Sequence, residues 1–266
     1  MINFIEWDLL RQALITGTFA ALVAGTVGYF MVLRRLAFAG HALGHIGFAG
    51  ATGAGLLNLT PFTGQLGLTV LAGIGMGVLG HRVNKSDLAI GIILALALGF
   101  GVLFLHFYTY YASQAMSVLF GNLLGVSQRA FNNMLWMGGL SLVLIAFIAR
   151  PLFFASLEPE LAEAKGVCIP LVNTLFMVSV AVAVSVVSQV IGVLLVFTLL
   201  IGPAAAALNW SRYLLSGLVI TVLLSLFIVW SGILMAFITD WPIPFWISFL
   251  VAIVYFLSVL TKLKNT

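Results

Sequence analysis

The chain has 266 residues, of which 63% are hydrophobic and only 7% are Asp, Glu, Lys or Arg. An ordinary soluble domain carries about 25% charged residues, so this composition excludes a soluble enzyme, a nucleic-acid-binding protein and a disordered chain. It indicates an all-α polytopic membrane protein. The single cysteine, Cys168, excludes a disulfide framework and a multi-cysteine metal site within the chain.

Nine apolar stretches have the length of about 20 residues that a helix needs to cross the hydrocarbon of a membrane. None of them contains Lys, Arg, Asp or Glu. No soluble domain separates them, so we expect residues 1–266 to form a single transmembrane domain. The expected transmembrane helices are residues 13–33, 36–58, 63–80, 88–108, 130–149, 168–187, 189–208, 213–238 and 243–261.

The basic residues predict an orientation, because Lys and Arg accumulate in loops on the cytoplasmic side of a membrane. With the N-terminus outside and the C-terminus inside, only Arg11 and Arg129 face outward. An even number of spans would require a re-entrant segment, and the Gly- and Ala-rich stretch 36–58 is the first candidate. Nine of the eleven Lys and Arg face inward in this arrangement: Arg34, Arg35, Arg82, Lys85, Arg150, Lys165, Arg212, Lys262 and Lys264.

Two stretches outside the expected spans have patterns of their own. Ala112–Val126 is mildly amphipathic and lies on the expected outer side, either as an interfacial helix or as part of a pore lining. In the inner loop 150–170, Pro159 suits the first position of a short helix and Gly166 suits the residue after its end. So short a helix persists only when it packs on something, which is either this chain's own inner face or a cytoplasmic partner.

His41 and His45 are the only ionisable side chains well inside an expected span. Such a residue costs several kcal/mol unless it faces a polar path or a partner, so it marks a candidate functional site. Spacing of four residues places both imidazoles on one face of a helix, where they could bind one ion such as Zn²⁺, Cu²⁺, Ni²⁺ or Fe²⁺. The alternative is that they only hydrogen-bond neighbouring helices, and the paired spacing favours the ion site.

Other chemistry fits these residues less well. A membrane zinc protease uses His-Glu-x-x-His with the Glu as general base, and Ala42 occupies the position of that Glu. A bis-haem site needs histidines on facing helices, and no other span has a central one. We expect the remaining polar side chains at depth to form hydrogen bonds between helices rather than to bind an ion: Ser185, Ser188, Gln189 and Thr198.

Four stretches follow one another along the chain: Arg34–Gly50, Leu119–Ser127, Glu158–Gly166 and Ile191–Ala204. Together they resemble the zinc/manganese-type ABC transporter permeases. The first is similar to the family signature on the second span, and the second to a segment before the fifth span. The third resembles the family's cytoplasmic coupling loop, and the fourth its Gly-to-Pro motif on the seventh span. The resemblance covers nearly the whole chain.

The resemblance implies a homodimer in the bacterial inner membrane, two cytoplasmic ATP-binding subunits and an extracytoplasmic metal-binding protein. It implies that Glu158, Glu160, Ala162 and Gly166 belong to the ATPase-coupling helix. The family's pore ligands are a carboxylate and, four residues later, a histidine. His45 matches that histidine, whereas His41 replaces the carboxylate and Gly44 replaces the usual Ser.

The expected function is therefore the membrane permease subunit of an ABC importer for a divalent metal ion. Zinc is favoured over manganese because two imidazoles are softer ligands than carboxylates, and manganese or iron are further possible substrates. We expect no permanently bound cofactor and no enzymatic activity, since the chain lacks a phosphate-binding G-x-x-x-x-G-K-[ST] loop. The alternatives are a self-sufficient transporter or channel gated by histidine protonation, and a membrane scaffold without a pore.

Overall fold

The structure, a computed structural model, describes residues 4–79, 86–107, 119–121, 125–211 and 213–264. Every regular element in these ranges is a helix. The elements are α1 (Phe4–Leu33), α2 (Ala37–Ala54), η1 (Gly55–Leu57), α3 (Pro61–Leu79), α4 (Ser86–His106), α6 (Gln128–Asn133), η3 (Met134–Gly138), α7 (Gly139–Leu157), α8 (Pro159–Ala164), α9 (Ile169–Ile191), α10 (Val193–Trp210), α11 (Leu214–Thr239) and α12 (Ile243–Lys264).

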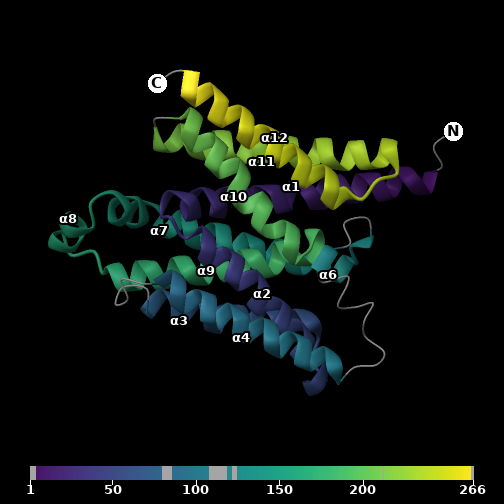
Figure 1. Ribbon diagram of the computed structural model, residues 1–266, viewed down its shortest axis with the longest axis horizontal. Coiled ribbons are helices and arrows are strands. Elements are labelled where there is room, and N and C mark those ends of the chain that lie inside the picture. Colours follow the sequence, from purple (N-terminus) through teal and green to yellow (C-terminus); the bar gives the residue numbers. More distant parts are fainter. Residues whose placement is uncertain (1–3, 80–85, 108–118, 122–124, 212, 265–266) are drawn as a thin grey trace.

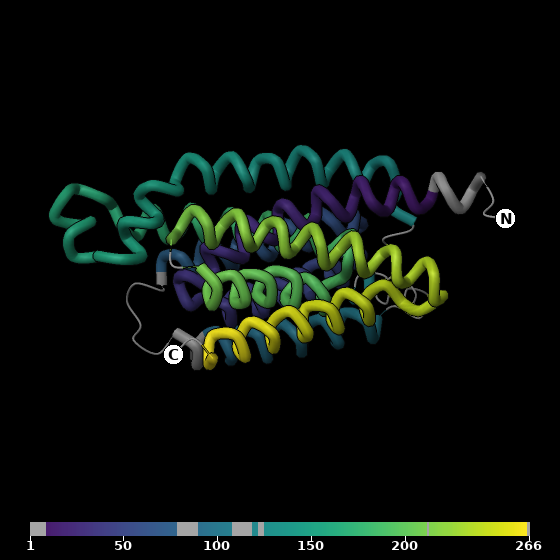
Figure 2. Tube along the Cα trace, turned by 90° about the horizontal axis from the view of Figure 1, so that it is seen from above, coloured from purple at the N-terminus to yellow at the C-terminus, as the bar shows by residue number. Residues whose placement is uncertain are grey.

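The long helices lie side by side along the longest axis of the molecule (Figure 1). One group consists of α2, α3 and α4 packed beside α9, and a second group consists of α1 with α10, α11 and α12. The N-terminus and the C-terminus lie at opposite ends of the bundle, and α8 projects from the end that holds the C-terminus (Figures 1 and 2). Helix α7 runs along one face of the bundle (Figure 2).

Each of the nine expected spans overlaps a long helix, which confirms an all-helical polytopic membrane protein. Within the described ranges, seven helical stretches are long and apolar enough to cross a membrane. Helix α2 is not among them, and only Ile90–His106 of α4 counts, as a shorter apolar helix. The five glycines and two histidines of α2 lower its hydropathy. Because most of α2 is buried among other helices, it does not need a lipid-facing apolar surface.

The inner loop is shorter than expected, because the fifth span does not end at residue 149. Helix α7 continues through Arg150 and Pro151 to Leu157. A proline inside a helix removes one backbone hydrogen bond without necessarily ending the helix. Only residue 158 lies between α7 and α8, and residues 165–168 join α8 to α9.

Polar side chains link α3 to α9 inside the bundle. The hydroxyls of Thr69 and Ser185 lie 2.6 Å apart, and the amide of Gln65 donates a hydrogen bond to Ser188. This confirms the prediction that Ser185 and Ser188 form hydrogen bonds between helices. Their partners on α3 were not predicted from the sequence. The neighbouring Gln189 differs, because its Oε1 atom is buried without a hydrogen-bond partner.

Some expectations fall outside the described residues. Most of the outer segment Ala112–Val126 is among them, and so are Arg82, Lys85 and Arg212. The described part of the outer segment includes Gly121, which lies directly against the junction of α9 and α10. A Cβ atom on Gly121 would lie 2.4 Å from the backbone nitrogen of Gly192. At this contact neither Gly121 nor Gly192 has room for a side chain.

Candidate metal site and coupling helix

The helix that carries the histidines begins immediately after a tight turn. The amide of Leu36 donates to the carbonyl of Met31, and the amide of Arg35 donates to that of Val32. This is the hydrogen-bond pattern of a Schellman motif, with Arg35 in the left-handed conformation at φ 58°. Helix α2 then starts at Ala37, so the end of α1 determines where α2 enters the bundle.

His41 and His45 contact each other on one face of α2, as their spacing predicted. Their ring centroids are 4.7 Å apart and the ring planes meet at 81°. Both side chains are partly buried. The Nδ1 atom of His45 is buried and has no hydrogen-bond partner, which is uncommon for a polar atom in a protein interior. The site therefore places an imidazole nitrogen that has no hydrogen-bond partner beside a second imidazole ring.

Helix α10 packs against α2 at the two histidines. The ring of Phe197 makes an edge contact with His41, with centroids 4.8 Å apart and planes at 66°. Next to His45, a Cβ atom on Gly44 would lie 3.3 Å from a side-chain carbon of Val193. The sequence did not predict the contact between Phe197 and His41, because no local pattern connects residues that are so far apart in the chain.

The glycines of α2 allow close packing with its neighbours. Gly40 faces the side chain of Met31, and Gly44 faces Val193. The close approach of two helix backbones is at Gly50, where an added Cβ would lie 2.4 Å from the carbonyl oxygen of Gly64 on α3. Helices α2 and α3 are thus in backbone contact one to two turns beyond the histidines.

One copy of the chain supplies a small set of metal ligands. In the part of the chain that the structure describes, no group of three or more His, Cys, Asp or Glu side chains could hold a metal ion. The third described histidine, His106, ends α4, where its ring contacts Phe107. His81 lies outside the described residues. A tetrahedral metal site takes four ligands, and this pair would supply two of them.

The short inner helix forms as its sequence predicts. Pro159 occupies its first turn, and Gly166 adopts the left-handed conformation at φ 84°. The amide of Gly166 donates to the carbonyl of Glu163, and the amide of Val167 donates to that of Ala162. These two hydrogen bonds again form a Schellman motif, which ends the helix at a defined residue.

Helix α8 has one face packed on its own chain and one face open. Ala162 is 0% exposed and packs with Ala155 and Ile169, so it anchors the helix. Leu161, by contrast, is 43% exposed. The outer face surrounds an open hollow lined by Glu158, Pro159, Glu160, Leu161 and Ala164. The helix therefore packs on its own chain through Ala162, and Leu161 belongs to its exposed face.

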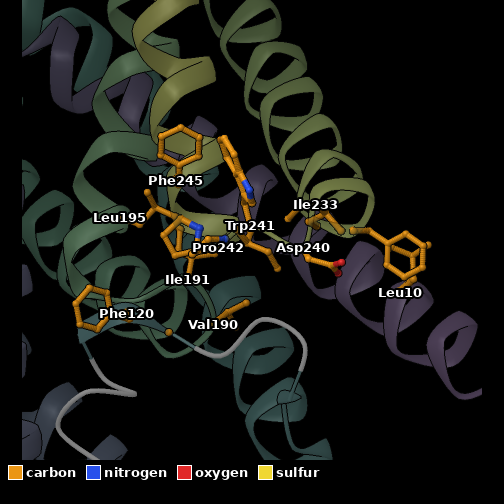
Figure 3. Close-up of a pocket in the computed structure, with 15 residues that line it drawn as sticks. Leu10, Phe120, Val190, Ile191, Leu195, Ile233, Asp240, Trp241, Pro242 and Phe245 are labelled. Atoms are coloured by element: carbon orange, nitrogen blue, oxygen red, sulfur yellow. The ribbon is translucent and has the colours of Figure 1, made fainter.

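Another hollow lies apart from the histidines. A cavity of about 830 Å³ lies at the end of the bundle opposite α8, and its floor includes Ile191, Leu195 and Ile233 (Figure 3). Asp240 and Trp241 lie in the turn between α11 and α12 that borders it. Because neither His41 nor His45 lines this cavity, it is not the candidate ion site.

Comparison with known proteins identifies the family. Residues 6–262 match the ABC 3 transport family. The chain is 31% identical over 234 residues to the manganese import system permease protein ScaB of Streptococcus parasanguinis, covering 85% of this chain and 83% of that protein. It is 26% identical over 238 residues to the high-affinity zinc uptake system membrane protein ZnuB of Haemophilus influenzae, covering 88% and 90%.

A solved structure shows the same fold. A chain of PsaBC from Streptococcus pneumoniae in complex with Fab has a TM-score of 0.81 at 27% identity, covering 94% of this chain and 90% of that chain. The resemblance seen in the four sequence stretches is thereby confirmed. Because the family match extends over nearly the whole chain, the protein belongs to the ABC 3 transport family and is a multi-pass permease subunit of a bacterial ABC transporter, not itself catalytic.

Proposed function

We propose that this chain is the permease of an importer for a divalent metal ion, with His41 and His45 as ligands in its ion path. The observation that carries this proposal is the pair of imidazole rings 4.7 Å apart, with the buried Nδ1 atom of His45 lacking a partner. Similar permeases are named for manganese in Streptococcus parasanguinis and for zinc in Haemophilus influenzae.

The ligand chemistry supports Zn²⁺ as the preferred ion. Imidazole nitrogen suits Zn²⁺, whereas Mn²⁺ prefers the harder oxygen ligands. Zn²⁺ commonly takes four ligands in tetrahedral geometry, and one chain offers two in the described site. A second copy of the chain would supply the other two imidazoles, so the proposed unit of transport is a homodimer with a shared site.

The proposed orientation places the N-terminus outside and α8 in the cytoplasm. Arg34, Arg35, Arg150, Lys165, Lys262 and Lys264 then lie at or near the cytoplasmic end. Cytoplasmic ATP-binding subunits would dock on the open face of α8, and an extracytoplasmic metal-binding protein would deliver the ion at the other end. Docking in this position is supported by the exposed surface around Glu160 and Leu161.

The orientation can be tested by thiol labelling. Replacing Cys168 with Ala removes the only cysteine. On that background, single cysteines at exposed Thr60 and Asp240 should react in intact cells with a reagent that does not cross membranes. A cysteine at exposed Lys264 should react only after the cells are opened. Labelling of Lys264→Cys in intact cells would contradict the proposed orientation.

The function is tested by metal uptake in cells that depend on this transporter. His45→Ala should abolish uptake of radiolabelled zinc at normal membrane levels of the protein. His106→Ala is the matched control, because it removes an imidazole at the end of α4, outside the pair. Normal uptake by His45→Ala would show that the histidines only pack helices. Zinc flux through the purified chain alone in vesicles without ATP would instead favour a self-sufficient transporter.

A further inference from the structure

Arg34 makes an unusual contact across the bundle. Its guanidinium donates a hydrogen bond to the side-chain oxygen of Asn173. The central carbon of the same group lies 5.4 Å from the ring centroid of Phe176. Asn173 and Phe176 belong to the first two turns of α9, whereas Arg34 follows the last residue of α1. One side chain therefore joins the turn before α2 to the beginning of α9.

The contact is enclosed. Phe176 is fully buried, and the Nη1 atom of Arg34 is buried without a hydrogen-bond partner. Burial lowers the pKa of the Arg34 guanidinium from its ordinary value, although arginine remains charged at neutral pH. Holding a charged group away from water is costly, and the neighbouring Arg35 is exposed. An arginine at the cytoplasmic end of a transmembrane helix would ordinarily extend into water, as Arg35 does.

The two ends of this contact belong to the two functional elements. Asn173 lies in the helix that follows α8 after only the four residues 165–168. Helix α8 is also fastened to the start of α9, because Ala162 packs with Ile169. On the other side, Arg34 is three residues before Ala37, where α2 begins, and His41 and His45 follow about one and two turns later.

The turn between α1 and α2 is well placed to transmit a displacement. The two Schellman hydrogen bonds described above tie Arg35 and Leu36 to the last turn of α1, so the end of α1, Arg34 and the residue before α2 form one unit. Helix α9 is a single helix from Ile169 to Ile191. Elsewhere in the bundle, α3 packs against both α2 and α9. Helix α2 also packs directly on α9, and the Arg34 contact adds a hydrogen-bonded side-chain connection at the end where α8 lies.

We propose that Arg34 is a positioning residue that transmits movement of α8 and α9 to α2. This inference rests on the proposed function, in which the ATP-binding subunits act on α8. When α8 shifts, the first turns of α9 shift with it, and the hydrogen bond from Arg34 to Asn173 carries the turn before α2 in the same direction. The histidine pair then changes position together with the ATP-binding subunits.

The first test measures coupling in the complete transporter reconstituted in vesicles. Arg34→Lys keeps the charge but loses the planar guanidinium, which donates the hydrogen bond to Asn173 and lies over the ring of Phe176. Asn173→Ala removes the acceptor, whereas Asn173→Asp keeps it. We expect Arg34→Lys and Asn173→Ala to lower the zinc transported per ATP hydrolysed by about fivefold or more, within the usual range of coupling between sites. Asn173→Asp and Arg35→Lys should retain the wild-type ratio.

The second test follows movement itself. On the Cys168→Ala background, a single cysteine is placed at exposed Phe38 on α2 or at exposed Leu171 on α9. In the complete transporter, addition of ATP should change the thiol-labelling rate at both positions. With Arg34→Lys, the change at Leu171 should persist and the change at Phe38 should disappear. A purely structural role would weaken both changes or neither.

The outcomes separate this inference from the proposed function. A wild-type ratio of zinc to ATP in Arg34→Lys, together with an unchanged ATP response at Phe38, would overturn the role of Arg34. Wild-type vesicles that take up no zinc with ATP would refute the proposed function before any variant is compared. In that case the labelling at Phe38 still decides the role of Arg34, because it reports movement of α2 and not transport of metal.

Discussion

His41 and His45 stand nearly perpendicular on one face of α2, with ring centroids 4.7 Å apart. Each ring also has its own surroundings. His41 lies edge-on to Phe197, whereas His45 keeps its Nδ1 atom buried and without a partner. The two histidines are therefore not equivalent, and substitutions at the two positions should have different effects. The resemblance to the family implies that His45 corresponds to the family histidine and that His41 replaces the family carboxylate.

Replacing His41 with Asp should change the metal preference without stopping transport. The substitution gives the carboxylate–histidine pair that the resemblance implies for the family, and carboxylate oxygen is a harder ligand than imidazole nitrogen. We expect the ratio of zinc to manganese uptake to fall, measured by competition between the two labelled metals at matched membrane levels. An unchanged ratio would show that His41 does not contact the ion. His41→Ala serves as the control for simple loss of the imidazole.

Acidification should inhibit uptake more steeply in the wild type than in His41→Asp. An imidazole binds metal only when neutral, and an unperturbed histidine has a pKa of about 6.5. Lowering the pH therefore protonates both wild-type ligands and releases the ion. A carboxylate has an unperturbed pKa of about 3.9, so the variant retains one charged ligand over the same range. The measurement is the initial uptake rate at external pH values from roughly 5 to 8, and parallel curves would contradict the expectation.

Gly166→Val should uncouple transport from ATP hydrolysis. Gly166 adopts φ 84°, and an added Cβ would meet no atom within 4 Å. The cost of the substitution is therefore conformational, because a β-branched residue disfavours positive φ. Uptake should fall while the membrane level of the protein stays near normal. Gly166→Asn is the matched control, since asparagine tolerates the left-handed conformation, and equal activity of the two variants would contradict this explanation.

Gly192→Ala should destabilise the protein at the junction of α9 and α10. Gly192 has φ 85°, and an added Cβ would lie 2.4 Å from the carbonyl oxygen of Leu119. The strained backbone alone costs roughly 1–3 kcal/mol, and the steric overlap adds to it. The thermal unfolding midpoint in detergent should therefore fall. Gly67→Ala is the control, because a Cβ there meets no atom within 4 Å, and its midpoint should be unchanged or slightly higher.

The amino-acid sequence by itself predicts the helices and the features that depend on a few neighbouring residues. Apolar stretches as long as the membrane is thick become helices because the backbone must satisfy its own hydrogen bonds in hydrocarbon. The spacing of His41 and His45 places them on one face through the period of the helix alone. Pro159 and Gly166 mark the two ends of α8 because helix ends are satisfied by local hydrogen bonds.

Contacts between distant helices were decided only by the tertiary structure. Phe197 meets His41, Asn173 meets Arg34, and Gly121 meets Gly192, and each pair is separated by more than 70 residues. No periodicity links such positions, because the pairing depends on which helix faces which and at what depth. For the same reason the sequence did not show that α2 and α3 come into backbone contact at Gly50 and Gly64.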